Sequence, residues 1–483
     1  MVEEHNRKKY YKKKIYKKKI YKKKPYKAKG DKTENILYEK NIYKALFTTA
    51  FPLMASNFII ALLDMTDTFF IGRLDNSASA QAAMGAAWPI INIMLAFNNG
   101  LAAAGVALIS RMVGEENYEG AGKQAGALVG VALVMGAAIN TFMFFAASAV
   151  MSFMGADGEV LGQAAAYLRV SSFEMIPLFI FAAFCSIRQS VGDMMYPVIL
   201  SVVAAVANIA AAMVFINVLG MGIKGAAAAS VAGQLSIVPF YIKGLFNGKA
   251  TVTINLDDMR LSAKEIKKLF KIAGPSIEGQ LLASFGFVIL QMLILKEGKE
   301  ISAAFSIGNK ISNIILAVVM ALSTTMSAFV GQNIGAENME RAKRAYSVSR
   351  NMSVLMMMAG LVILFPMRKQ LVGIMSNDGK TVAAAVKYIA VVLITLPGLA
   401  LYQNYIGVFN GSGNTVLTLF MSFVWLWVLR IPMLLAVGRM YPDNPGAIWI
   451  VMGISNVLAA AAGHLLYRHI YVKNGVRRGV FTF

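Results

Sequence analysis

The chain has 483 residues, 57% of them hydrophobic, and a mean hydropathy of +0.58. This composition excludes an ordinary soluble protein, in which buried and exposed faces must balance, and the single cysteine, Cys185, excludes an intramolecular disulfide. The formal charge of +22 is unevenly spread, because residues 1–40 hold sixteen Lys or Arg and five Asp or Glu, half of the excess.

The first 41 residues form a basic tail, in which the unit Tyr-Lys-Lys-Lys recurs at Tyr11, Tyr16 and Tyr21. A low-complexity segment of like charges repels itself and cannot bury a core, so we expect residues 1–41 to be disordered. Lysines interleaved with tyrosines also occur in RNA-binding segments, but a basic tail on a membrane protein more often lies on anionic lipid. We therefore expect a lipid bilayer, and no nucleic acid, as a partner.

The remainder of the chain is a series of apolar runs, each long enough to cross a bilayer as a helix. They predict twelve helices near 44–72, 80–110, 120–150, 161–187, 194–218, 223–246, 268–295, 301–332, 342–366, 381–409, 415–438 and 446–468. An even number puts both termini on one side of the membrane. The loops on the side of the tail hold sixteen Lys or Arg and the opposite loops eight. The positive-inside rule then predicts that both termini are cytoplasmic.

An internal repeat divides these helices into two sets. Ile109–Ala121 resembles Val330–Ala342, and the offset between these two segments also aligns Tyr167 with Tyr388. The same constant offset aligns Gly192-Asp193 with Gly413-Asn414 and Gly225-Ala226 with Gly446-Ala447. We therefore expect an all-α membrane protein of two six-helix lobes related by a parallel repeat. The predicted boundaries are 42–246 and 268–473 for the lobes, 247–267 for a charged cytoplasmic linker, and 474–483 for a cytoplasmic tail.

Such a parallel repeat has a functional implication. Both lobes begin on the same side of the membrane, so the axis that relates them lies along the membrane normal. Two like-oriented lobes around a central cleft are typical of carriers that work by alternating access.

Two carboxylates, Asp64 and Asp67, lie near the far end of the first predicted helix, in the stretch Pro52–Gly72. An ionised carboxylate at the centre of a membrane helix costs about 2.5–3.5 kcal/mol on insertion scales, so a purely structural span seldom keeps two. At spacing i, i+3 both share one side of the helix, which must face protein or a water-filled cavity. The alternative is that one of them lies at the membrane–water boundary, near Arg73 and Asp75.

Polar residues of the second lobe are candidates for a substrate cleft. Glu278 follows Pro275 in the seventh helix and Lys310 lies within the eighth. These two could form an ion pair inside the lobe, or either could contact substrate. The tenth helix carries a polar aromatic patch that fits a cavity or simple packing equally well, formed by Tyr402, Gln403, Asn404 and Tyr405.

Several of these segments resemble one known family. The stretch Pro52–Gly72 with Asp67-Thr68, the loop Arg111–Ala121, the turn Ile187–Pro197 and above all Phe329–Ala342 are similar to the multidrug and toxic compound extrusion (MATE) family. The resemblance covers the chain after about residue 42. It implies a twelve-helix, two-lobed antiporter that exports organic molecules against an inward flow of Na⁺ or H⁺.

The resemblance also implies an ion site in the N-terminal lobe. An Asp of the family's first helix matches Asp67, an Asn of its fifth helix matches Asn208, and a hydroxyl residue of its sixth helix matches Ser230. The chain departs from the pattern at a second carboxylate of the fifth helix, where Ala212 stands. Asp64 stands where relatives often have Asn and is a candidate replacement for the missing acid.

The coupling ion stays open between H⁺ and Na⁺, and the residues favour H⁺. Na⁺ prefers several oxygen ligands and Ala212 supplies none, whereas a proton needs one carboxylate whose proton affinity is raised by burial. Two neighbouring acids strengthen this interpretation, because they resist joint ionisation and titrate as a unit. The alternative is a Na⁺ site built from Asp67, Asn208 and Ser230.

The predicted function is a secondary active efflux antiporter of the cell membrane, a monomer without a cofactor, that exports organic and often cationic compounds. The alternative is a flippase for a lipid-linked precursor. Flippases of the wider superfamily tend to line the cleft with several basic residues, and this chain offers chiefly Lys310 and Arg430. A channel or receptor would leave the repeat unexplained. No enzyme motif is evident, and His464 and His469 have no neighbouring carboxylate to support a zinc site.

Overall fold

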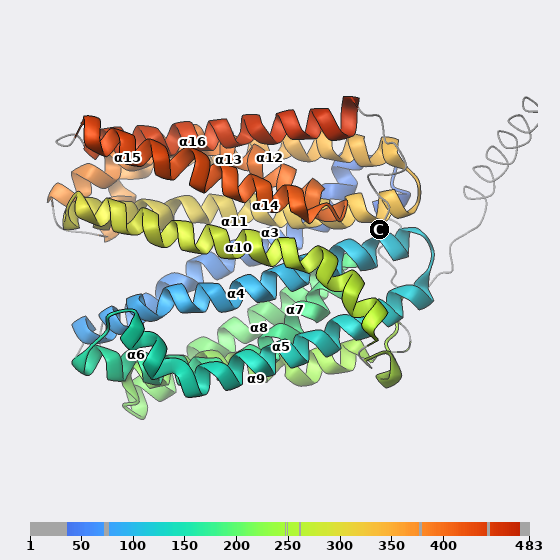
Figure 1. The fold of residues 1–483 in the computed structure, drawn as a ribbon, viewed down its shortest axis with the longest axis horizontal. Helices are drawn as coiled ribbons and strands as arrows, with labels where there is room; N and C mark the ends of the chain where they lie inside the picture. Colours follow the sequence, from blue (N-terminus) through green and yellow to red (C-terminus); the bar gives the residue numbers. More distant parts are fainter. Residues whose placement is uncertain are drawn as a thin grey trace, which may run out of the picture.

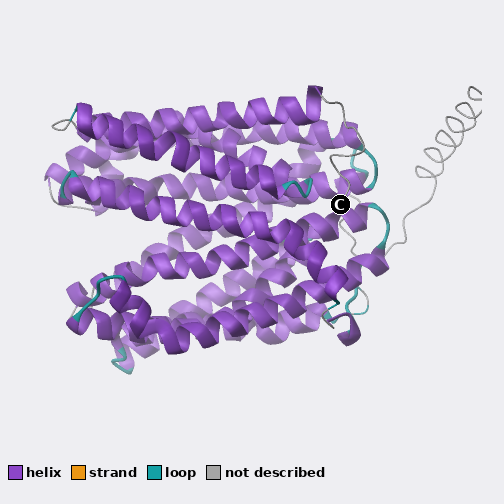
Figure 2. Ribbon diagram, viewed as in Figure 1, coloured by secondary structure: helices purple, strands orange, loops and turns teal. Residues whose placement is uncertain are grey.

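The structure is a computed structural model that describes residues 36–71, 77–246, 248, 250–259, 262–375, 379–441 and 445–473. Within these ranges all regular structure is helical, and most helices run along the long axis of the molecule (Figure 2). Residues 1–35 of the predicted N-terminal tail (1–41) and the whole predicted C-terminal tail (474–483) lie outside the described residues.

The N-terminal half contributes α3 (Ile42–Ile71), α4 (Ser77–Gly114), α5 (Tyr118–Phe153), α6 (Gly158–Ser172), α7 (Met175–Ser190), α8 (Met195–Ala212) with a π-helical continuation (Met213–Val218), and α9 (Gly222–Leu245). After a short 3₁₀ turn (Leu256–Met259), the C-terminal half contributes α10 (Ala263–Lys296), α11 (Lys299–Gly335), α12 (Met339–Met375), α13 (Gly379–Gly411), α14 (Thr415–Phe423), a π-helical segment (Val424–Arg430), α15 (Ile431–Met440), and α16 (Pro445–Tyr467) with its π-helical end (Arg468–Lys473). Figure 1 shows the two halves as an upper and a lower group.

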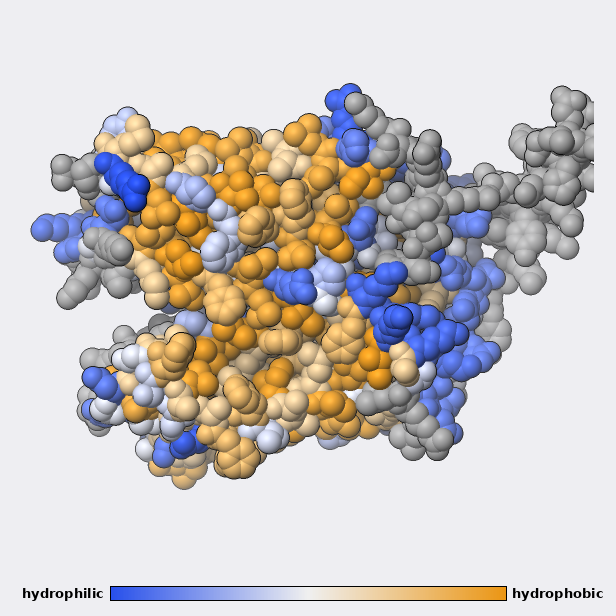
Figure 3. Space-filling view, viewed as in Figure 1, coloured by the Kyte–Doolittle hydropathy of each residue, from blue (hydrophilic) through white to orange (hydrophobic). Residues whose placement is uncertain are grey.

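The membrane-protein prediction is confirmed. In the described part of the chain, ten helices are long and apolar enough to cross a membrane, and the pair α6 and α7, bent by 46°, makes an eleventh. With the 30-residue α3, the segments number twelve. Apolar side chains cover the middle of the molecule, while hydrophilic ones gather at the ends of the helices (Figure 3). The protein is therefore a multi-pass membrane protein.

Two helix predictions need correction. The predicted helix 161–187 is broken between Ser172 and Met175, just before Pro177, which has no N–H to donate to the Phe173 carbonyl. The predicted helix 342–366 does not stop at its proline, since α12 continues through Pro366 to Met375. Interior prolines are tolerated in membrane helices, where neighbouring groups satisfy the freed carbonyl.

The parallel repeat is confirmed by the backbone itself. Gly192 and Gly413, which the repeat aligns, both have positive φ, at 82° and 75°, in the turns after α7 and α13. Glu116 and Glu337 are separated by the same offset, with φ of 58° and 55°, and the structure describes no other non-glycine residue with positive φ. Side chains rarely adopt this left-handed conformation, so the two loops share one unusual geometry.

Helix packing repeats as well. Ser186 Oγ of α7 donates to the Ala102 carbonyl of α4 at 3.1 Å. At the equivalent positions of the other half, Gly407 of α13 lies so close to α11 that a Cβ would come within 2.6 Å of the Ser323 carbonyl oxygen. The two lobes therefore share one packing plan.

Each half also places part of its first helix in the core of the other half. The hydrophobic core of the C-terminal half includes four buried residues of α3, namely Ala45, Leu46, Ala50 and Met54. The core of the N-terminal half includes four buried residues of α10, namely Leu269, Ile272, Ala273 and Ile277. Gly100 of α4 permits this approach, because a Cβ there would lie 2.8 Å from the Ile277 backbone nitrogen.

The described residues on either side of the N-terminal lobe pack against its neighbours, although residues 1–41 were expected to be disordered. Ile36, within the predicted tail, is fully buried and accepts a hydrogen bond from Arg341 Nε at 2.9 Å. In the predicted linker, Val252 and Ile254 belong to the core of the N-terminal half. A Cβ on Gly122 of α5 would lie 2.5 Å from the Thr253 carbonyl oxygen, so the linker packs directly on this helix.

Candidate functional site

The polar pair Asn208 and Ser230 forms the described part of the candidate ion site. Gly233 lets α9 approach α8 closely, since a Cβ there would lie 2.7 Å from the Ala204 carbonyl oxygen. One turn away, Asn208 Nδ2 donates to Ser230 Oγ at 3.0 Å, and both side chains are half-buried. Because the amide NH₂ donates, the Asn208 carbonyl oxygen and a lone pair of the Ser230 hydroxyl are free to bind a cation.

The helix that carries the two predicted aspartates packs next to the helices of the pair Asn208 and Ser230. Helix α3 carries Asp64 and Asp67 in its second half and packs against both α8 and α9. The side chains of these two aspartates lie outside the described residues. The structure thus brings together the three helices that carry the four predicted ion-site residues.

The polar aromatic patch of α13 is mostly inside the C-terminal core. Asn404 is fully buried, accepts from Ser349 Oγ at 2.6 Å and donates to Ser353 Oγ at 2.7 Å. Tyr405 is 2% exposed, and its hydroxyl lies 3.0 Å from His464 Nδ1. Tyr402 is likewise buried, whereas Gln403 is half-buried. In this conformation the patch packs α13 against its neighbours, and its role as a substrate contact stays a prediction.

The two charged candidates of the same lobe do not form the ion pair considered above. Glu278 of α10 and Lys310 of α11 are both exposed, and no ion pair joins them among the described residues. Their role as substrate contacts stays a prediction.

The C-terminal lobe contains a buried cation, Arg430, whose surroundings could not be predicted from the sequence. Arg430 is 6% exposed, and its guanidinium donates to Ser455 Oγ at 2.9 Å and to the side-chain oxygen Oδ1 of Asn456. It also lies 4.7 Å from the ring centre of Trp425. These neutral partners and the aromatic face offset part of the cost of burying the charge. In the sequence, an arginine inside an apolar run indicates that the side chain is buried, but it does not indicate which residues bind the guanidinium.

The two lobes meet through a crossing of α4 and α11. Ser110 and Gly114 of α4 face Gly331 and Gly335 of α11, and the repeat aligns the first pair with the second. A Cβ on Gly114 would overlap the Gln332 carbonyl oxygen, and one on Gly335 would overlap that of Arg111. Small residues four apart let membrane helices approach to backbone contact, and here both helices present such a pair. We call this crossing the seam.

Further contacts close the same end of the molecule. Gln332, fully buried, donates from Nε2 to the Ser190 carbonyl at the end of α7. A small apolar cluster joins Val106, Met194 and Ala328, with Leu53 of α3 against it. At the opposite, left-hand end the surface is hollowed between the two lobes (Figure 3). The lobes are thus closed against each other at the end where α4 and α11 finish.

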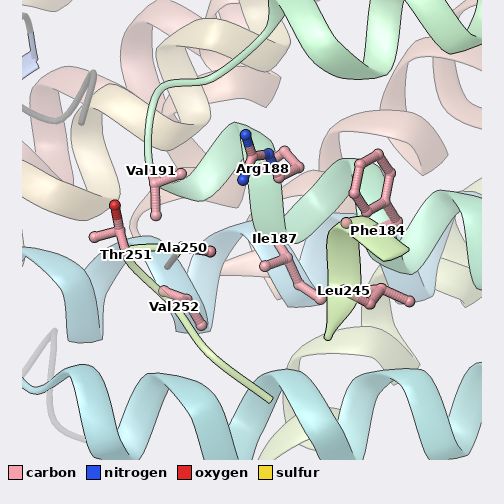
Figure 4. A pocket seen from close by; sticks show the side chains of 9 residues that line it. Phe184, Ile187, Arg188, Val191, Leu245, Ala250, Thr251 and Val252 are labelled. Carbon is pink, nitrogen blue, oxygen red and sulfur yellow. The ribbon is translucent and has the colours of Figure 1, made fainter. Parts of the chain in front are cut away.

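A small cavity lies at the same end, inside the N-terminal lobe. It has a volume of about 10 Å³ and is lined by α7, α9 and the linker, with Arg188, Val191 and Val252 among its walls (Figure 4). This is room for about one water molecule, and the Arg188 Nε is buried without a protein partner. The cavity fits a bound water and is too small for an organic substrate.

Comparison with known proteins identifies the class to which this arrangement belongs. The MatE family model matches residues 52–214 and 275–435, one match in each lobe and more than half of the chain together. Two repeated helical lobes that meet in a seam, with polar groups inside them, define a membrane transporter of the MATE type. The chain belongs to the MatE family.

Individual relatives are distant but cover nearly the whole chain. The "Multidrug export protein MepA" of Staphylococcus saprophyticus is 21% identical over 442 residues, 90% of this chain and 96% of its own. The structure described as "Crystal structure of MATE in complex with MaL6" superimposes with a TM-score of 0.86 at 21% identity, covering 90% of this chain and 97% of that one. An "Outward-facing conformation of a multidrug resistance MATE family transporter of the MOP superfamily" gives a TM-score of 0.83 at 21% identity, covering 92% and 96%.

Proposed function

We propose that this protein is a secondary active efflux antiporter of the cell membrane, which exports organic compounds in exchange for H⁺ or Na⁺ by alternating access. The observation that carries the proposal is the seam, because it closes two pseudo-equivalent lobes at one end only. The name of the staphylococcal relative, a multidrug export protein, supports small organic molecules as substrates. The carrier works as a monomer, without enzymatic activity or cofactor.

The seam also fits one orientation in the membrane. The loops on the seam side hold twice as many Lys or Arg as the opposite loops, sixteen against eight, which supports a cytoplasmic seam and cytoplasmic termini. A transporter closed at its cytoplasmic end and hollowed at the other is outward-facing. A MATE family transporter solved in an outward-facing conformation has the same fold.

Coupling is assigned to the N-terminal lobe. Asp67 is the exchangeable carboxylate, Asp64 is its coupled partner, and Asn208 with Ser230 supplies neutral oxygens next to them. A proton requires fewer ligands than Na⁺, and this set lacks the second carboxylate that the family resemblance implies in α8, where Ala212 stands. H⁺ is therefore the preferred ion, and a Na⁺ site formed by Asp67, Asn208 and Ser230 is the alternative.

The flippase alternative is not favoured. It depends on basic residues that are free to bind phosphate in the cleft, and Arg430 is instead buried against Ser455, Asn456 and Trp425. Lys310 alone remains exposed of the two basic residues that supported this alternative.

The decisive experiment is transport by the purified full-length protein in liposomes. Ethidium, an organic cation, is followed while a pH gradient or a Na⁺ gradient is imposed separately. We expect ethidium movement that is driven by the pH gradient and collapses with a protonophore. Movement driven only by Na⁺ would favour the sodium site, and no response to either gradient, with a panel of organic cations and anions, would overturn the antiporter assignment.

A further inference from the structure

A groove at the seam end of the molecule lies between the start of α3 and the start of α12. It has a volume of about 460 Å³ and opens to the surface. Its walls include Lys40, Asn41 and Tyr43 from the first segment and Lys343, Arg344 and Ser347 from the second. The groove is separate from the ion-site helices α8 and α9, so the proposed transport cycle does not account for it.

The charge of this groove is positive and largely uncompensated. Three of its lining residues are cations and none is an acid. Of the nearby carboxylates, Glu39 is engaged by Lys44 Nζ at 3.6 Å, and Glu340 lies 3.8 Å from Lys343 Nζ. Lys40 and Arg344 have no ion-pair partner among the described residues, and both are exposed. Basic pockets between membrane helices at the cytoplasmic surface are suited to anionic lipid headgroups.

An aromatic ridge continues the groove along α3. Tyr43, which lines the groove, is followed at helical spacing by Phe47 and Phe51, so the three share one face. They are 52%, 45% and 54% exposed, and the two phenylalanine rings lie 5.5 Å apart. Tyrosine at the interface and phenylalanine deeper in the apolar layer provide a surface for an acyl chain. A free phosphate ion would gain nothing from this ridge.

We propose that the groove binds one anionic phospholipid, with its phosphate among Lys40, Lys343 and Arg344 and an acyl chain along Tyr43, Phe47 and Phe51. The Asn41 side-chain amide, whose oxygen accepts from the Lys44 backbone N–H, supplies a neutral N–H donor at the same place. The proposal rests on the cytoplasmic orientation given above and is independent of transport. A lipid in this position holds the first helix of one half against α12 of the other.

The test is lipid binding to the full-length protein in detergent, measured by native mass spectrometry. Phosphatidylglycerol and phosphatidylcholine with the same acyl chains are titrated separately against the wild type, Lys40→Gln/Arg344→Gln and Lys369→Gln. The last variant removes an exposed cation at the other end of α12. We expect a preference for phosphatidylglycerol that weakens about fivefold per cation removed from the groove. Equal binding by the double variant and the Lys369→Gln control would overturn the proposal.

Two more arms separate a lipid from a phosphate site. Phe47→Ser/Phe51→Ser should weaken binding of the long-chain lipid severalfold and leave dihexanoyl phosphatidylglycerol unaffected. Inorganic phosphate at millimolar concentration should not displace the long-chain lipid. Displacement by phosphate, or a ridge variant that binds like the wild type, would make the groove a phosphate site and remove the lipid. Thermal unfolding of each variant verifies that it is folded.

Discussion

Asp67 is the side chain on which the proposed coupling depends. It lies on a helix that packs against the two helices of the hydrogen-bonded pair Asn208 and Ser230. We expect Asp67→Asn to abolish gradient-driven export while insertion and folding persist, because the exchange needs an ionisable group and the amide keeps the shape. Export is measured in liposomes, with Asp157→Asn, in the loop before α6, as the matched control. Near-normal export by Asp67→Asn would contradict the assignment.

The role of Asp64 is tested by the pH dependence of export. If the two carboxylates titrate as a unit, removing one charge changes the pH at which the other exchanges its proton. Asp64→Asn should therefore shift the pH profile of export at fixed Na⁺ without ending transport. Superimposable profiles of the variant and the wild type would remove Asp64 from the mechanism.

At this scale the sequence could name residues but not their surroundings. Asn208 and Ser230 are 22 positions apart, and their pairing was implied only by family resemblance, yet they form a hydrogen bond. Tyr402, Asn404 and Tyr405 have the same polar character, but they are buried in a network inside the lobe. Whether a polar side chain faces a cavity or a neighbouring helix depends on helix rotation, which an almost uniformly apolar sequence leaves undetermined.

Among the elements, the seam between α4 and α11 makes the most specific prediction. Adding a methyl group at Gly335 places it against the Arg111 carbonyl, a backbone atom that cannot rotate away. Overpacking of this kind costs about 1–3 kcal/mol. We expect Gly335→Ala to open the seam end in a large share of molecules, because only the closed form contains this contact.

Opening can be measured as a distance between spin labels at Lys123 and Glu340, exposed residues at the seam ends of α5 and α12. The matched control is Gly274→Ala in α10, where a Cβ meets no atom within 4 Å. The wild type and this control should share one short distance, and Gly335→Ala should add a longer one. An unchanged distribution would show that another contact closes this end.

Element boundaries show what a local signal can decide. The apolar runs of the sequence predicted every membrane segment that the structure describes, because the length and hydropathy of a run are enough to identify a membrane helix. Proline did not decide where helices end. Pro52, Pro89, Pro239, Pro275, Pro366 and Pro397 all lie inside continuous helices, whereas the segment at Pro177 is broken three residues earlier. The difference depends on how each freed carbonyl is satisfied by surrounding structure, which is tertiary information.

For the whole molecule, the repeat was the strongest sequence signal, and its geometry extends to individual φ angles at Glu116 and Glu337. A constant offset between equivalent residues predicted two similar halves. It could not predict that α3 and α10 pack across the boundary, since both halves of a repeat look alike to a comparison of sequence alone. At the seam end, the starts of α3 and α10 therefore belong to one half by sequence and to the hydrophobic core of the other half by packing.

That exchange of α3 and α10 makes neither half of the chain a self-sufficient folding unit. A chain cut after Gly248 gives two fragments, each missing buried residues that the other supplies, in the manner of a split protein. We expect either fragment expressed alone to be degraded by protease in the membrane, and the two expressed together to form a 1:1 complex that unfolds cooperatively. Size-exclusion chromatography and limited proteolysis would measure this. A fragment that is monodisperse and protease-resistant by itself would mean that the exchanged helices are dispensable.

If the two fragments complement each other, both halves must be made before either is complete. Assembly of this transporter is then a mutual insertion of helices rather than the docking of two finished lobes.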